Sequence, residues 1–250
     1  MSSTVNFITA DSKKINLENN SVDLIVTQAP FYQLDFDYYG GDPTKQIGSE
    51  KNTKKYISSL LSATKEMERV LKPTGSIFVC ISNTEPLYSE YVSSVLKKTN
   101  LFLANPPFIW NWSENVKENN LGIVNFNYHL IYHFIKSPGL MYSNPYSVRK
   151  YSEAIWNIPA KDDSNKITKK LEPLGFVENS FRSEIPKKLI EMFSKPKDVV
   201  LDPFGGSGTT ACEAYALNRS AITIDGSEDQ TELAKIRFDF IKQELEKDKT

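Results

Sequence analysis

A glycine-rich turn between an apolar strand and a helix constrains the fold of this chain more than any other feature. The run 198–202 (DVVLD) is rich in β-formers, and the turn 203–208 (PFGGSG) follows it directly. A helical pattern then covers about 209–217, and a second apolar run, 220–225 (SAITID), comes next. Continuous apolar runs are typical of strands buried on both faces, and their alternation with a helix indicates neighbouring parallel strands.

The same alternation occurs earlier in the chain. The runs 21–27 (SVDLIVT) and 75–81 (GSIFVCI) indicate two more buried strands. Between them, a helical pattern from about 54 to 71 ends where Pro73 and Gly75 forbid a helix. Further elements are expected as strands at 6–9, 108–110 and 128–135 and as a closing helix at 229–247. We therefore predict an α/β fold with a doubly wound, mostly parallel sheet and a small variable insertion.

Composition limits the class of protein. The 250 residues include 30 basic and 31 acidic side chains, so binding to nucleic acid would need a local basic face. No apolar run reaches the length of a membrane span, and the first residues lack the pattern of a secretory signal, so we expect a cytoplasmic protein. The two cysteines, Cys80 and Cys212, have no metal-ligand spacing and only two histidines accompany them. We expect buried thiols and no bound metal.

The glycine turn is the expected ligand site. In an open parallel sheet, ligands bind beyond the carboxyl ends of the strands, and Gly205, Gly206 and Gly208 stand there. Glycines allow a sharp turn and a close approach of the backbone to a ligand. Asp225 ends the next strand, 23 positions after Asp202. A carboxylate in that place can accept hydrogen bonds from both ribose hydroxyls of an adenosine cofactor.

The segment 206–211 also fits the dinucleotide fingerprint G-x-G-x-x-G/A, but two features argue against NAD. Asp202 places a negative charge where a pyrophosphate would be repelled, whereas the same charge suits an ammonium group. Only 25 residues follow Asp225, which is too few for a second nucleotide-binding half.

The segment 201–210 (LDPFGGSGTT) resembles the cofactor motif of the beta-class amino DNA methyltransferases, in which the catalytic motif precedes the cofactor motif. The segments 46–50 (QIGSE), 69–76 (RVLKPTGS) and 185–190 (IPKKLI) resemble other parts of that family, so the likeness covers most of the chain. The resemblance implies a Rossmann-like fold with permuted motif order and S-adenosylmethionine as methyl donor. It implies cofactor contacts from Asp11, Asp202, Phe204, Gly205, Gly206, Ser207, Gly208, Thr209 and Asp225.

The loop after the first buried strand matches the position of the family's catalytic motif. An exocyclic amino nitrogen is a poor nucleophile, and two acceptors for its hydrogens help to free its lone pair. The family supplies Ser, Asp or Asn, then Pro-Pro, then an aromatic residue, and the target base is flipped out of the duplex. Here Gln28 would supply the acceptor, Pro30 the rigid backbone, and Phe31 the stacking ring. The longer Gln28 side chain and Ala29 in place of proline depart from the pattern.

A second candidate loop, 105–108 (NPPF), matches the family's adenine-type tetrapeptide literally, but it follows the 69–76 motif, where the family has no catalytic loop. We interpret it as a proline-rich turn. Thr27 and the segment 46–50 favour cytosine N4 as the target, with adenine N6 as the alternative. The altered loop also leaves open a catalytically silent subunit that binds the cofactor or DNA. An RNA or small-molecule methyltransferase is a third reading.

We expect three segments in one domain: a catalytic half at 1–136, a variable target-recognition segment at 137–184, and a cofactor-binding half at 185–250. The expected substrate is double-stranded DNA, and a second copy or a partner subunit is left open. The candidate basic groups for DNA are Arg149, Lys150, Lys161, Lys166, Lys169, Lys170, Lys187 and Lys188.

Overall fold

A computed structural model describes residues 3–33, 46–82, 87–112, 127–159 and 181–247. Within these residues the strands form one nine-stranded sheet, in the order β1-β9-β8-β2-β3-β6-β5-β7, with β4 also paired to β6. The first five strands of this order run parallel: β1 Val5–Thr9, β9 Ser220–Asp225, β8 Val199–Asp202, β2 Val22–Gln28 and β3 Leu71–Ser82.

The other side of the sheet is mixed. Its strands are β6 Tyr128–Ile135, β5 Phe108–Asn111, β4 Phe102–Leu103 and β7 Ile155–Asn157. β6 runs antiparallel to β3, β5 and β4, while β7 runs parallel to β5. The prediction of an α/β fold with a mostly parallel sheet is confirmed, and the expected strands at 6–9, 108–110 and 128–135 are all present. The antiparallel direction of β6 was not predicted, because an apolar run carries no information about strand direction.

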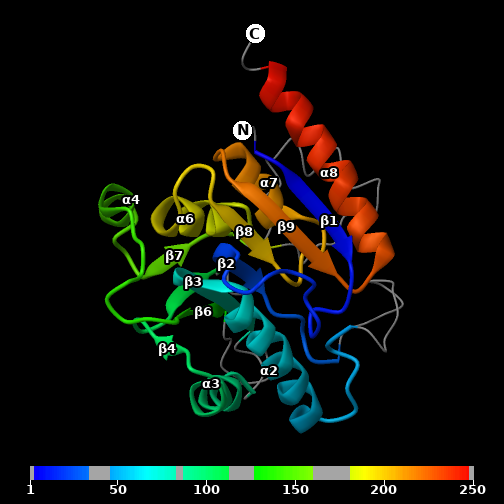
Figure 1. Ribbon diagram of the computed structural model, residues 1–250, viewed down its shortest axis with the longest axis vertical. Helices are drawn as coiled ribbons and strands as arrows, with labels where there is room; N and C mark the ends of the chain where they lie inside the picture. The colour runs from blue at the N-terminus through cyan, green and yellow to red at the C-terminus, as the bar shows by residue number, and fades with distance from the viewer. Residues whose placement is uncertain (1–2, 34–45, 83–86, 113–126, 160–180, 248–250) are drawn as a thin grey trace, which may run out of the picture.

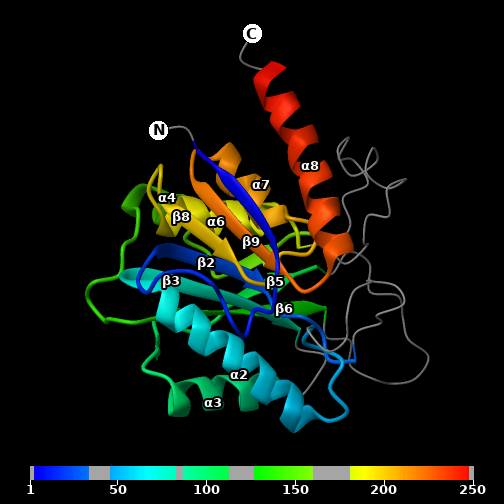
Figure 2. The same cartoon turned by 45° about the vertical axis from the view of Figure 1, so that its right-hand side comes forward.

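Helices cover both faces of the sheet, as Figures 1 and 2 show. α2 Thr53–Val70 and α3 Leu87–Lys98 lie on one face, and α6 Glu184–Phe193 and α7 Thr209–Ala216 lie on the other. The terminal helix α8 Glu228–Lys247 contacts α7, β1 and β9. Because successive side chains of a strand point to opposite faces, β2 divides its residues between two cores: Ile25 joins the α2 side, and Leu24 and Val26 join the α6 side.

The start and the end of helix α2 follow from particular residues of the sequence. Asn52 caps it by accepting a hydrogen bond from the backbone N–H of Lys55 at 3.0 Å. The helix ends at Val70, one residue before the end predicted from Pro73 and Gly75, and β3 begins at Leu71. β3 thus starts earlier than predicted and reaches its regular pairing with β2 through a shift of register in the Pro73–Gly75 region.

Two described elements lie in the segment expected to be variable. α4 Pro145–Lys150 is capped by Asn144, and β7 adds to the sheet edge beside β5. Trp156 of β7 is buried and donates its indole N–H to the carbonyl of Glu153 at 2.8 Å, which is a packing role. No helix in the described ranges is long and apolar enough to cross a membrane. Both cysteines are buried, as predicted.

Candidate active site

The carboxyl ends of the parallel strands gather most of the predicted site residues at one edge of the sheet. Asp225 ends β9, Asp202 ends β8 and Gln28 ends β2, in neighbouring positions, and Asp11 follows the end of β1. The connections of the chain leave β8 and β2 toward opposite faces, since α7 follows β8 on one face and α2 follows β2 on the other. Such a point of reversal opens a crevice for ligands beyond the strand ends.

The glycine turn is hydrogen-bonded to β9, the next strand along the chain. The backbone N–H of Gly205 donates to the carbonyl of Ile224 at 2.9 Å, and that of Gly208 donates to the carbonyl of Gly205 at 2.8 Å. Gly206 and Gly208 have φ values of +47° and +77°, which glycine adopts without strain. A Cβ placed on Gly206 would meet only the Oε1 of Gln230, at a van der Waals distance of 4.0 Å.

Asp225 lies between the turn and the start of α8. Its Oδ2 accepts the backbone N–H of Gly206 at 2.8 Å, and its Oδ1 accepts that of Ser227 at 2.9 Å. Burial raises the pKa of Asp225, and hydrogen bonds from Ser227, Gly206 and Gln46 counteract part of that rise. Each carboxylate oxygen has a second lone pair, so Asp225 is held in place while it keeps acceptor capacity for a ligand hydroxyl.

Asp202 links the two predicted halves of the site. Its Oδ1 accepts the hydroxyl of Thr27 at 2.6 Å and the backbone N–H of Phe204 at 3.1 Å. The Thr27 bond fixes the end of β2, and with it Gln28, beside the first residue of the turn. Burial raises the pKa of Asp202 to about 6, and Asp225 adds to the rise. Asp202 forms no ion pair with a described residue, so the buried carboxylate suits a positively charged group from a ligand.

The predicted catalytic loop begins at the end of β2. Gln28 is partly buried and follows Leu24 and Val26 on the face covered by α6 and α7. The next backbone N–H, that of Ala29, donates to the carbonyl of Cys80 in β3 at 2.9 Å, which anchors the loop. The ring centroid of Phe31 lies 6.2 Å from that of His129 in β6. Burial lowers the pKa of His129 to about 4, so this ring is neutral at pH 7.

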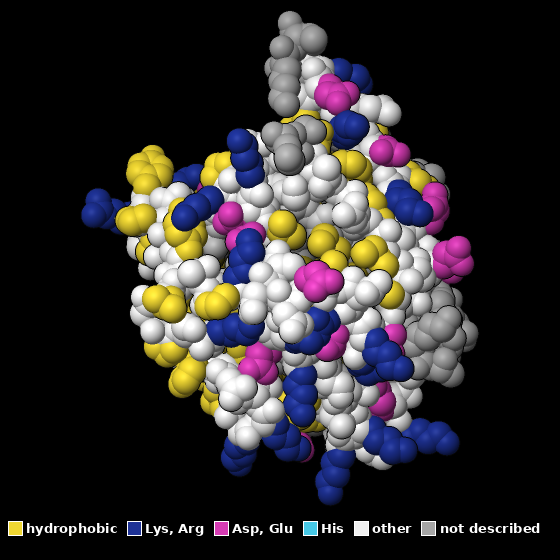
Figure 3. Space-filling view, viewed as in Figure 1, with side chains coloured by type: hydrophobic (Ala, Val, Ile, Leu, Met, Phe, Trp, Pro, Cys, Tyr) yellow, Lys and Arg dark blue, Asp and Glu magenta, His cyan; other side chains and the backbone are white. Residues whose placement is uncertain are grey.

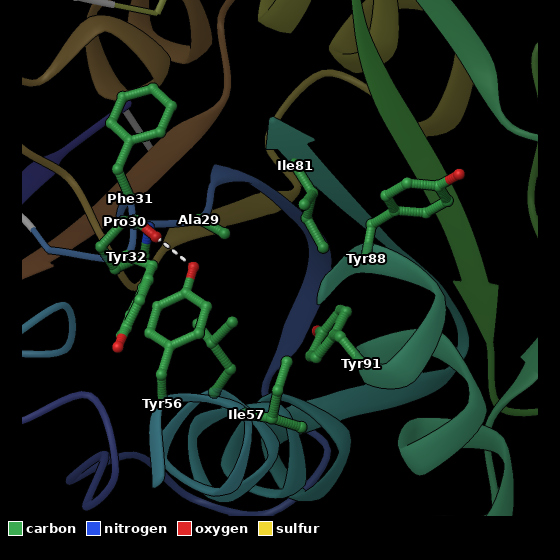
Figure 4. A pocket seen from close by; sticks show the side chains of 10 residues that line it. Ala29, Pro30, Phe31, Tyr32, Tyr56, Ile57, Ile81, Tyr88 and Tyr91 are labelled. Carbon is green, nitrogen blue, oxygen red and sulfur yellow. Dashed lines mark hydrogen bonds between the residues drawn. The ribbon is translucent and has the colours of Figure 1, made fainter. Parts of the chain in front are cut away.

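A second anchor comes from the opposite face. The hydroxyl of Tyr56 in α2 donates to the carbonyl of Pro30 at 2.6 Å. This bond closes a tyrosine-rich pocket under the loop, and Figure 4 shows the Phe31 side chain directed away from Tyr56 and Tyr88. The pocket is lined by Ala29, Pro30, Phe31, Tyr32, Tyr56, Ile57, Leu60, Ile81, Tyr88 and Tyr91. Because it lies mainly on the α2 and α3 side, it supports the loop from the face opposite to Gln28.

The alternative tetrapeptide lies elsewhere in the sheet. Asn105 follows β4, and its amide nitrogen lies 3.0 Å from the Nδ1 of His133 in β6. The Nε2 of His133 in turn lies 3.0 Å from the Oγ of Ser76, near the amino end of the regular part of β3. Asn105 is partly buried and extends a polar chain whose other members, His133 and Ser76, are buried. This chain lies away from the strand ends that carry Gln28 and Asp202. This placement fits a structural turn.

The remaining predicted residues fall into two groups. Phe204, Ser207 and Thr209 lie in the turn or at the start of α7, beside Asp202. Asp11 lies one strand beyond Asp225: the backbone N–H of Ala10 donates to the carbonyl of Asp225 at 2.9 Å. The Oδ1 of Asp11 accepts the backbone N–H of Lys13 at 2.9 Å. Sequence reasoning missed Arg237 of α8, which donates to the hydroxyls of Ser207 and Thr209.

The basic groups predicted for DNA are partly engaged within the protein. Lys150 forms an ion pair with Glu191 at 3.4 Å, and the Lys188 ammonium lies 4.6 Å from the ring centroid of Tyr151. Lys161, Lys166, Lys169 and Lys170 lie outside the described residues. Figure 3 shows the face of the molecule that is turned to the viewer in Figure 1. On this face, basic side chains project along the lower edge, and mixed charges cover the rest. The described surface therefore shows no single basic face in this view.

Comparisons with known proteins agree on one family. The model of the family described as DNA methylase (N6_N4_Mtase) matches residues 22–236. The type II methyltransferase M.HpaI of Haemophilus parainfluenzae is 29% identical in an alignment of 237 residues that covers 90% of this chain and 70% of that protein.

Two solved structures share the fold. The PvuII DNA methyltransferase (cytosine-N4-specific) has a TM-score of 0.76 and 21% identity, over 98% of this chain and 93% of that one. A putative DNA modification methylase of Thermus thermophilus, solved with S-adenosyl-L-methionine, has a TM-score of 0.68 and 21% identity, over 96% and 94% of the two chains.

Proposed function

The chain belongs to the N6/N4 family of DNA methylases, which are S-adenosylmethionine-dependent enzymes, and from that premise we propose that it methylates the N4 amino group of cytosine in double-stranded DNA. The observation that carries the methyl-transfer reaction is the 2.6 Å hydrogen bond from Thr27 to Asp202. It couples the loop suited to an amino group with the turn suited to the methyl donor. Adenine N6 is the alternative target.

The residues around the turn fit the cofactor. The turn of glycine backbone, the acceptor oxygens of Asp225 and the buried charge of Asp202 match a backbone contact, a ribose and an ammonium group, respectively. We therefore assign the ribose to Asp225, the methionine ammonium to Asp202 and the adenine side to Asp11. When bound, S-adenosylmethionine supplies an electrophilic methyl group on its sulfonium.

The loop residues act on the base. We assign the side-chain oxygen of Gln28 as one acceptor for the amino hydrogens. The carbonyl of Pro30 faces Tyr56 of α2, on the side opposite to Gln28, so we assign the carbonyl of Ala29 as the second acceptor. Accepting both hydrogens draws the nitrogen toward a tetrahedral geometry and directs its lone pair outward. Flipping the base out of the duplex costs a few kcal/mol, and stacking of Phe31 on the flipped base offsets part of that cost.

The target base is tested in a host that lacks its own DNA methylation. We expect DNA from cells that express the chain to contain N4-methylcytosine at one short sequence, as read by sequencing of modified bases and by mass spectrometry of the nucleosides. N6-methyladenine in its place would overturn the assignment of the base and keep the reaction class. Unmodified DNA from cells with soluble protein would contradict the reaction itself.

Cofactor binding should depend on pH through Asp202. Its pKa of about 6 in the folded protein exceeds the ordinary 3.8, so its charge destabilises the unliganded fold as pH rises from about 4 to 6. The ammonium of a ligand needs that charge. We expect S-adenosylhomocysteine to bind about tenfold more weakly at pH 5 than at pH 7, measured by calorimetry.

Two variants separate the titration of Asp202 from that of other groups. One such group is Glu213, because burial raises its pKa to about 7. Asp202→Asn should flatten the profile. Thr27→Val should move the midpoint to higher pH, because the Thr27 hydroxyl lowers the pKa of Asp202. Equal affinity of the wild type at pH 5 and pH 7 would show that Asp202 does not meet the ammonium.

A further inference from the structure

The terminal helix α8 packs against the glycine turn. Gln230, Ala234 and Arg237 follow one another at helical spacing, so they share one face of α8. A Cβ placed on Gly208 would lie 2.9 Å from the Cβ of Ala234, which shows how closely the helix packs on the turn. Figures 1 and 2 show α8 running alongside β1 and α7.

Arg237 of α8 makes polar contacts with the glycine turn and with the start of α7. One terminal nitrogen, Nη1, donates to the Oγ of Ser207 at 3.2 Å and to the Oγ1 of Thr209. A guanidinium has only donors, so both hydroxyls must accept, and their own protons turn away from Arg237. Burial lowers the pKa of Arg237, and Glu213 of α7 opposes that change as a nearby negative charge. The side chain thus holds two consecutive turns of backbone, the glycine turn and the first turn of α7.

On the basis of the proposed function, we infer that Arg237 is a positioning residue for the amino-acid end of the cofactor. It acts through Ser207 and Thr209 and has no direct contact with the reacting atoms. The carboxylate of an α-amino acid shares a carbon with the ammonium group. An ammonium at Asp202 therefore brings the carboxylate to the neighbouring residues, which are the turn and the start of α7.

The chemistry at that place suits a carboxylate. The first N–H groups of α7 and the positive end of the helix favour an anion. Ser207 and Thr209 are both buried, so their orientation is set by the protein contacts rather than by solvent. Arg237 holds both residues through Nη1. A lysine ends one atom nearer the backbone of α8, so it should loosen the carboxylate end and leave the adenosine end, at Asp225, in place.

Two ligands separate the two ends. S-adenosylhomocysteine carries the amino-acid group, and 5′-methylthioadenosine has the same thioether and adenosine without it. We expect Arg237→Lys to weaken S-adenosylhomocysteine by about tenfold and 5′-methylthioadenosine by no more than about twofold, measured by calorimetric titration. Thr209→Val, which removes the accepting hydroxyl and keeps the volume, should show the same selectivity and serves if the lysine variant fails to fold.

Arg219 provides the matched control. It is 7% exposed and donates to the carbonyl and hydroxyl of Ser194 at 2.7 and 3.1 Å, away from the glycine turn. Arg219→Lys should lower the melting temperature in the way that Arg237→Lys does, and it should leave the affinity for both ligands unchanged.

The possible outcomes separate the proposed function, which requires cofactor binding, from the role of Arg237. A wild type that binds neither ligand contradicts the proposed function. A wild type that binds both, with Arg237→Lys weakening the two ligands equally, overturns the role of Arg237 alone. The same conclusion follows if Arg237→Lys weakens S-adenosylhomocysteine no more than Arg219→Lys does.

Discussion

Replacing Gln28 by alanine is expected to lower the rate of methyl transfer to DNA by about 10²–10³-fold, with little change in cofactor affinity. Gln28 is the last residue of β2, and it is held beside the cofactor turn by the neighbouring bond from Thr27 to Asp202. Its oxygen is the side-chain acceptor assigned to the amino group, so its loss removes a contact needed at the transition state. Single-turnover transfer of a labelled methyl group to DNA measures the rate.

Asn105→Ala is the matched control for this experiment, because it truncates the amide of the alternative loop. We expect it to leave the transfer rate unchanged and to lower stability by about 1 kcal/mol through loss of the contact with His133. A large rate loss from Asn105→Ala with none from Gln28→Ala would move the catalytic loop to residues 105–108. A wild type that binds cofactor and DNA without transfer would identify a silent subunit.

Gly205→Ala is expected to destabilise the protein by about 3 kcal/mol or more, enough to impair folding. A Cβ at this position would lie 1.7 Å from the Oγ1 and 3.1 Å from the Cβ of Thr223 in β9. Thr223 is buried and β-branched, so it has little freedom to move aside. The turn would have to lift away from β9, which would also displace Gly206 from Asp225. Chemical denaturation measures the loss of stability.

The steric cause is tested by a second substitution. Thr223→Ala removes the atom in closest conflict, so the double variant Gly205→Ala with Thr223→Ala should be more stable than Gly205→Ala alone. Such a gain from a substitution that is destabilising in the wild type is a coupling between two contacting residues. If the double variant loses the sum of the two single effects, the contact between turn and strand is not the reason for glycine at position 205.

Sequence alone predicted the parts of the site that depend on local pattern. The unbroken apolar runs before Asp202 and Asp225 indicated parallel strands, and the glycines between them indicated a turn at the strand ends. The carboxyl ends of parallel strands share an edge of the sheet, so these residues had to lie together once the fold was right. Gln28 followed from the same argument, because another apolar run leads to it.

Other parts depend on pairing between distant residues, which a single sequence does not reveal. The bond from Thr27 to Asp202 joins positions 175 apart, and the contact of Arg237 with Thr209 needs α8 to pack on the turn. The charged pattern of α8 indicated a helix but gave no reason to single out one arginine. The antiparallel strand β6 was foreseen as a strand without its direction, because both directions use the same apolar residues.

We propose that the glycine turn between Asp202 and Asp225 holds the methyl donor beside a base bound at Gln28. The most direct measurement incubates the purified chain with S-adenosylmethionine labelled in its methyl group and with unmethylated double-stranded DNA, then separates the nucleosides. We expect label in N4-methylcytosine and formation of S-adenosylhomocysteine in equal amount. Label that stays entirely in the cofactor, at concentrations where the protein binds both cofactor and DNA, would contradict it.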